Sequence, residues 1–165
     1  MKEKIKKELK NSKGFTLIEL LVVIAIIGLL ATMSVVALNS AREKARDSRR
    51  LSDVKQVQTA LEMYYSTAGV YPSNSNFTVG SSIATSSQTF MGSIPSNPTP
   101  VNDGDCPSGA EYQYDSNGLT YTIMYCLGAQ TNDIVSGTNC AMPSGINATS
   151  TVSDVCVGPS GAMSW

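Results

Sequence analysis

The stretch that decides the fold is Gly14-Phe15-Thr16-Leu17-Ile18-Glu19-Leu20-Leu21-Val22-Val23-Ile24-Ala25-Ile26-Ile27-Gly28-Leu29-Leu30. It opens an apolar run in which residues 20–38 carry no charge. A helix of that length crosses the roughly 30 Å hydrocarbon core of a bilayer. One carboxylate, Glu19, stands at the edge of the run, and a carboxylate in lipid needs a partner. A membrane anchor needs neither this acid nor Gly14 in front of it, so the stretch indicates a function beyond anchoring.

The lysine-rich segment before the apolar run has two ordinary interpretations. A secretory signal has an apolar middle of about 7–15 residues, followed by a small residue at the cleavage site. Here the run is longer, and the small residue, Gly14, stands before it. A plain signal anchor explains the lysines and the length, but it explains neither Gly14 nor Glu19.

The segment from Lys13 to Ile24 resembles the N-terminal signature of type IV pilins and of the pseudopilins of type II secretion. The resemblance implies that a prepilin peptidase cuts between Gly14 and Phe15 and that the new N-terminus is methylated, which leaves 151 of the 165 residues. It also implies that Glu19 meets the Phe15 amine of a neighbouring subunit during assembly, neutralising both charges. Helix geometry also allows that contact within one chain, four residues apart. The plainer alternative places Glu19 at the lipid headgroups.

Charge is segregated along the chain, although the net charge is only −1. Six lysines lie in the first 14 residues, the other six basic residues lie between positions 42 and 55, and residues 66–165 contain six acids and no Lys or Arg. Such an acidic segment repels phosphate backbones and disfavours nucleic-acid binding. Histidine is absent, which removes the usual general base and the commonest metal ligand. The sequence therefore predicts no enzyme and no cofactor.

Four cysteines, Cys106, Cys126, Cys140 and Cys156, all follow the apolar run. An even count on one side of a membrane segment indicates disulfides in an oxidising compartment. A four-thiolate zinc site is the alternative, but the short paired spacings of such sites are missing. Of the three connectivities, the sequential one closes the smallest loops, and we predict it. Lys and Arg counts on the two sides of the run are equal, so the cysteines place the C-terminal part outside and the N-terminus inside.

Beyond the run, apolar residues continue at helical steps as far as Tyr64, without Pro or Gly between positions 37 and 65. We predict one helix from about Phe15 to Ser66. Its second half presents a charged face whose interpretation stays open: a solvated surface, a contact for anionic lipid headgroups, or a bridge to acidic patches on neighbouring subunits. The apolar positions of this half are Ala41, Ala45, Leu51, Val54, Val57, Leu61 and Tyr64; the charged ones are Arg42, Glu43, Arg46, Asp47, Arg49, Arg50 and Lys55.

The pattern of the rest of the chain, residues 67–165, predicts a small β-sheet head. Residues 73–105 indicate a long docked loop, 112–127 a hairpin turning at Asp115–Gly118, and 134–165 about two short strands. In the hairpin, Tyr121, Ile123 and Tyr125 share one face, and Thr122, Met124 and Cys126 share the other. The predicted fold class is α+β, the pilin fold: a long N-terminal transmembrane and amphipathic α-helix packed on a small antiparallel β-sheet head. Predicted segments are a leader (1–14), a transmembrane and polymerisation half (15–38), an amphipathic half (39–66) and the head (67–165).

Asp103 and Asp105 are weak calcium candidates, because some pseudopilin heads bind calcium; an acidic turn is the favoured interpretation, since the EF-hand pattern is absent.

The resemblance implies a structural subunit of a type IV pilus or pseudopilus. Its expected partners are further pilin subunits, the prepilin peptidase and methyltransferase, an assembly platform in the cytoplasmic membrane, and the lipid bilayer. It would be single-pass in that membrane and then part of a cell-surface or extracytoplasmic filament. The alternative is a monomeric, membrane-anchored extracytoplasmic binding domain.

Overall fold

The computed structural model describes residues 14–131, 133–148, 156–163 and 165, so positions 1–13 of the expected leader lie outside the described residues. The chain divides into two compact units, one ending at Ser40 and the other beginning at Ala41. The first unit, where described, contains residues 14–16 and the apolar part of one helix. The second contains the rest of that helix and all of the described strands.

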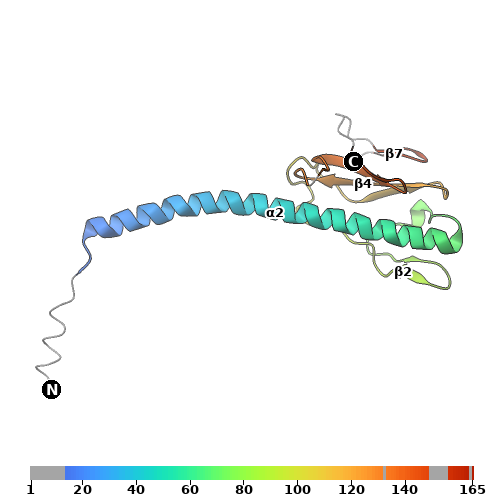
Figure 1. The fold of residues 1–165 in the computed structure, drawn as a ribbon, viewed down its shortest axis with the longest axis horizontal. Helices are drawn as coiled ribbons and strands as arrows, with labels where there is room; N and C mark the ends of the chain where they lie inside the picture. Colours follow the sequence, from blue (N-terminus) through green and yellow to red (C-terminus); the bar gives the residue numbers. More distant parts are fainter. Residues whose placement is uncertain (1–13, 132, 149–155, 164) are drawn as a thin grey trace, which may run out of the picture. The chain divides into compact units, whose positions relative to one another are not determined.

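A single helix, α2 (Leu17–Ala68), accounts for 52 residues (Figure 1). It begins and ends within two residues of the predicted positions. Gly69 ends it with a positive φ of 73°, and its N–H donates to the Tyr65 carbonyl at 2.8 Å; this left-handed conformation is the usual role of glycine after a helix. The apolar part of α2 is long and apolar enough to cross a membrane: one 18-residue window has a mean hydropathy of 2.8, and none of it is buried.

The main sheet has four antiparallel strands in the order β3 (Gln113–Ser116), β4 (Tyr121–Leu127), β5 (Gly137–Met142) and β6 (Gly145–Ala148). The predicted hairpin is β3–β4, and Gly118 supplies the positive φ, 85°. The turn was predicted too early, because Asp115 and Ser116 belong to β3 and pair with Thr122 and Tyr121. Asp115 stays in the strand because its carboxylate is held by Asn74 and Ser160.

Strand β4 is buried on both faces. Tyr121, Ile123 and Tyr125 pack in the main core with α2, as the alternation predicted. On the opposite face, Met124 contacts Cys140, Cys156 and Met163, while Cys126 packs with Cys106 and Ala110. This burial explains why β4 is the strand most readable from the sequence: both of its faces are apolar or form a disulfide.

Smaller elements surround this core. The helical turn η2 (Asn74–Asn76) and the hairpin of β1 (Ile83–Ala84) and β2 (Thr89–Met91) lie in the predicted docked loop, and β7 (Cys156–Gly158) pairs with β8 (Gly161–Met163). Figure 1 shows β2 and β4 on opposite sides of α2. Phe90 of β2 meets Tyr64 of α2 edge to face, with ring centroids 5.9 Å apart. Docking of the loop was therefore predicted correctly, but its hairpin was not.

The helix face that packs on the core differs from the predicted face at its N-terminal end. The buried apolar side chains of this face are Leu51, Val54, Val57, Ala60 and Leu61. Burial of each leucine or valine stabilises the fold by about 1–3 kcal/mol. Ala41 and Ala45, however, are exposed, and that prediction was wrong. Asp47 and Arg50 are fully buried instead. The Asp47 carboxylate accepts from backbone N–H groups and from Arg50, and the Arg50 guanidinium donates to a backbone carbonyl and to Asp103.

Candidate assembly and processing site

Gly14 and Phe15 lie before the first turn of α2, in neither helix nor strand. Both are exposed, Phe15 by 88% of its surface. A Cβ added to Gly14 would meet nothing within 4 Å. The bond between these two residues is therefore accessible and lies outside regular secondary structure, so a peptidase can reach it.

Thr16 and Glu19 form a capping box at the start of α2. The Glu19 carboxylate accepts hydrogen bonds from the Thr16 N–H at 2.8 Å and from the Thr16 hydroxyl at 2.6 Å. In return, the Glu19 N–H donates to the Thr16 hydroxyl oxygen at 3.3 Å. A Thr-x-x-Glu pattern of this kind satisfies N–H groups that would otherwise lack partners at a helix start. No role for Thr16 was predicted from the sequence, although the Thr-x-x-Glu spacing is the sequence pattern of a capping box.

The box means that Glu19 has local partners within a single chain. Both are neutral donors, so they satisfy hydrogen bonds without neutralising the carboxylate. None of the described residues forms an ion pair with Glu19. A carboxylate without a counter-charge is costly where water is excluded.

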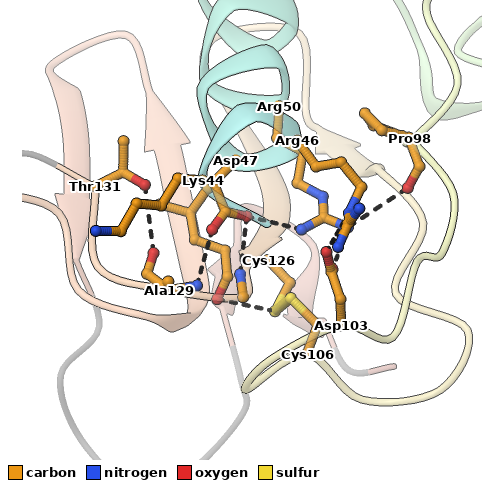
Figure 2. A network of polar contacts seen from close by, with 12 residues as sticks. Lys44, Arg46, Asp47, Arg50, Pro98, Asp103, Cys106, Cys126, Ala129 and Thr131 are labelled. Atoms are coloured by element: carbon orange, nitrogen blue, oxygen red, sulfur yellow. Dashed lines mark hydrogen bonds and ion pairs between the residues drawn. A yellow bond between two sulfur atoms is a disulfide. The ribbon is translucent and has the colours of Figure 1, made fainter. Parts of the chain in front are cut away.

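A second polar cluster, the helix lock, joins α2 to the head through Arg46, Asp47, Arg50 and Asp103 (Figure 2). The Arg50 guanidinium is fully buried and donates to Asp47 Oδ1 at 2.7 Å and to Asp103 Oδ1 at 2.6 Å. Its remaining donors reach Asn97 Oδ1 at 2.8 Å and the Pro100 carbonyl at 3.0 Å. Because the buried Arg50 guanidinium bonds to several groups of the 97–103 loop, it fixes that loop against the helix.

Asp47 extends the lock to the end of β4. Its two carboxylate oxygens accept from the N–H groups of Gly128 at 2.9 Å and Ala129 at 2.8 Å. Gly128 must be a glycine, because a Cβ there would overlap the Asp103 backbone. Gly104, at φ 55°, is equally confined by Gly128 and the Glu43 carboxylate. Two loops distant in sequence therefore meet on one turn of α2.

The lock bears on two interpretations that the sequence left open. Arg46, Asp47 and Arg50 do not lie on a solvated or lipid-facing surface, since Asp103 and backbone groups of the same chain hold them. The Asp103 carboxylate is occupied by Arg46 and Arg50, so it is not free to bind calcium. Asp105 is exposed, and among the described residues no three His, Cys, Asp or Glu side chains converge as a metal site would require.

Both disulfides follow the sequential pairing. Cys106 joins Cys126 and Cys140 joins Cys156, which leaves no thiolate for a zinc site. The first bond stands next to the helix lock, where the Cys106 N–H donates to the Asp103 carbonyl at 3.1 Å. Trp165 packs against both disulfide clusters, and its Nε1–H donates to Thr138 Oγ1 at 3.0 Å. The cross-links thus fix the two loops and the C-terminal hairpin.

Three carboxylates in the second unit have shifted pKa values. Burial alone would raise the pKa of Asp103, but hydrogen bonds from Arg46 and Arg50 outweigh it, and the net shift is downward. The pKa of Asp115 is likewise lowered, because hydrogen bonds from Ser160 and Asn74 outweigh burial. Burial dominates at Asp53 and raises its pKa, although the Tyr112 hydroxyl donates to it at 3.2 Å.

These shifts predict that the head loses stability in acid. An acid whose pKa is lowered by folding stabilises the fold above its unfolded value of about 3.9, and that contribution is lost as the pH falls through the folded value. We expect the thermal midpoint of the whole chain in detergent to drop between pH 4 and pH 2.5 by about 4 °C or more. Asp53 acts in the opposite direction, because its raised pKa favours the protonated fold.

Asp115→Asn should flatten this acid-induced drop and lower the midpoint at pH 7, whereas Asp133→Asn, at an exposed acid, should do neither. Circular dichroism melts of the three proteins across the pH series measure both effects. An Asp115→Asn curve parallel to that of the parent protein would contradict the assignment.

Comparison with known proteins agrees with this geometry. The model of the prokaryotic N-terminal methylation motif matches residues 9–35, which contain Gly14, Phe15 and Glu19. Type II secretion system core protein G of Vibrio cholerae is 33% identical over 144 residues, covering 80% of this chain and 90% of that protein. The chain belongs to the type IV pilin and pseudopilin family.

Two further relatives match a smaller part of this pilin-family chain. The core protein G of Pectobacterium carotovorum is 43% identical over 63 residues, 38% of this chain and 40% of the relative. The type IV wide pilus major component PilA4 of Thermus thermophilus is 42% identical over 66 residues, 40% of this chain and 50% of the relative. These alignments thus span half or less of the relatives' length. No solved structure matches the chain. The comparisons confirm the family, and the long helix with antiparallel sheets in a small head confirms the predicted α+β fold.

Proposed function

We propose that this chain is a structural subunit of a type IV pilus or type II secretion pseudopilus. In this proposal a prepilin peptidase cuts between Gly14 and Phe15, the new N-terminus is methylated, and the subunit waits in the cytoplasmic membrane with its N-terminus inside. Subunits then leave the membrane through an assembly platform and polymerise through residues 15–38. The head, residues 67–165 with the amphipathic half of the helix, faces outward, where its disulfides are stable.

One observation carries the proposal: an accessible Gly14–Phe15 bond directly precedes a capped helix whose apolar segment is unburied and whose acid, Glu19, forms no ion pair with any described residue. Cleavage would release an ammonium group at Phe15. A neighbouring subunit's Glu19 can neutralise that ammonium inside the helical bundle, where an isolated charge costs several kcal/mol. Cleavage and polymerisation are then two steps that use the same few residues.

Changing the cleavage residue tests the first step. Gly14→Leu should leave the chain at full length and prevent filament formation, because the scissile bond gains a bulky side chain. Gly28→Ala is the matched control, since it fills open space within α2 and improves helix propensity by about 1 kcal/mol. It should be cut like the parent.

Both proteins are expressed in cells that carry a prepilin peptidase and an assembly system. Mass spectrometry follows cleavage, and electron microscopy of sheared material follows filaments. A parent chain that is cut but recovered only as a membrane-bound monomer would favour the anchored binding domain.

A further inference from the structure

One face of the second half of α2 carries cations without ionic partners. Lys44 and Lys55 are exposed, and neither forms an ion pair with any described residue. They are eleven residues apart, which places them on one side of the helix about 16 Å apart along its axis. Figure 2 shows Lys44 extending away from Arg46 and Arg50 of the helix lock. We name this surface the Lys44–Lys55 face.

A groove lies along this face. Its volume is about 370 Å³, and it is lined by Lys55, Leu51, Gln56 and four hydroxyl side chains, Ser48, Ser52, Thr59 and Thr131. Lys44 lies outside this lining. Ser48 and Ser52 lie between the two lysines and are exposed. Small hydroxyl side chains between two cations let another backbone approach closely while offering hydrogen bonds. The two cations at its ends therefore favour an anionic partner on this face.

The same chain carries an anionic loop without a cation. Asp105 and Glu111 are exposed, and no described residue forms an ion pair with either of them. Residues 66–165 contain no Lys or Arg, so a cationic partner for this loop can only come from elsewhere. The loop is also rigid, because Cys106 is bonded to Cys126 and the Asp105 N–H donates to the Gly128 carbonyl at 3.0 Å. A rigid charged loop loses little entropy on binding.

The cations of the Lys44–Lys55 face and the acids of the 105–111 loop are complementary in charge. We propose that the 105–111 loop of one copy docks on the Lys44–Lys55 face of a second copy in the filament, an inference that rests on the proposed function. Asp103 of this region is already neutralised within the chain by Arg46 and Arg50. Among the described residues, each copy therefore keeps unpaired cations on the helix and unpaired acids on the loop. This arrangement is heterologous, and heterologous contacts extend into helical filaments. Anionic lipid headgroups are the competing occupant of the lysines, but they leave the acidic loop without a partner.

Charge reversal with rescue tests the contact in cells that assemble the full chain. Lys44→Glu with Lys55→Glu should lower the yield of sheared filaments about tenfold or more, because like charges then face each other. Asp105→Lys with Glu111→Lys should do the same. All four changes together should restore the yield to within about threefold. Arg42→Glu is the matched control, because Arg42 is exposed and unpaired but lies about 160° around the helix from Lys44.

The readouts separate the causes. Cleavage at Gly14 and the thermal midpoint of the head should be unchanged in every variant, which excludes failed processing and unfolding. Normal filament yield from the double lysine variant, or an equal loss in Arg42→Glu, would overturn the contact. Failure of the fourfold variant to recover, with lost binding of the lysine variant to phosphatidylglycerol vesicles, would assign the lysines to lipid instead. A parent chain that forms no filaments overturns the proposed function, and this contact with it.

Discussion

Replacing Glu19 with glutamine is expected to abolish filaments while leaving the chain cut after Gly14 and held in the membrane. Glutamine keeps the capping box, because its amide oxygen still accepts from Thr16. It removes only the negative charge, and the ammonium at Phe15 of the neighbouring copy then enters the bundle without compensation. A desolvated, unpaired ammonium costs several kcal/mol per contact, and the loss recurs at every subunit added. We therefore expect filament yield to fall by at least about a hundredfold.

Thr16→Ala is the complementary variant, because it removes the hydroxyl of the box and keeps the Glu19 charge. It should weaken the first turn by about 1 kcal/mol and reduce the yield only moderately. Sheared filaments counted by immunoblot, with cleavage followed by mass, compare the two. If Glu19→Gln assembles normally and Thr16→Ala does not, the role of Glu19 is to cap the helix and the neutralisation mechanism is wrong.

Arg50→Met is expected to cause the largest loss of stability in the second unit. Arg50 is fully buried and bonds Asp47, Asp103 and Asn97, so its removal leaves two carboxylates with fewer partners. Breaking a buried ion pair from one side typically costs about 3–5 kcal/mol of unfolding free energy. The 97–103 loop would also lose the hydrogen bonds from Arg50 that attach it to α2.

The neighbouring Arg49→Met provides the control for Arg50→Met. Arg49 is exposed, and its Nε lies 3.9 Å from Asp53. Such a surface pair contributes about 1 kcal/mol or less. Urea unfolding of both chains in detergent, followed by near-ultraviolet circular dichroism, gives the comparison. Losses of similar size in the two variants would mean that the buried lock contributes no more than an exposed pair.

Several parts of this account were readable from the sequence because the signals are local. The extent of α2, the β3–β4 hairpin and the two faces of β4 follow from apolar periodicity, from Gly69 and from Gly118. The cysteine pairing followed from loop length. Gly14, Phe15 and Glu19 lie within six residues, so their proximity needs no tertiary information.

The parts that were missed depend on contacts distant in sequence. Charged residues on a helix are usually solvated, and only the fold reveals that Arg50 meets Asp103, 53 residues away. The same packing leaves Ala41 and Ala45 exposed, against the prediction. The short β1–β2 hairpin, residues 83–91, lies in Ser- and Thr-rich sequence without a periodic signal, and its position is set by contacts such as that of Phe90 with Tyr64.

The central claim is that the filament is built from chains that begin at Phe15. The most direct test is the intact mass and N-terminal sequence of the subunit in purified, sheared filaments. We expect a chain of 151 residues with a methylated Phe15 and both disulfides formed. Filaments whose subunits retain the lysine-rich leader, or whose N-terminus begins at another residue, would contradict it.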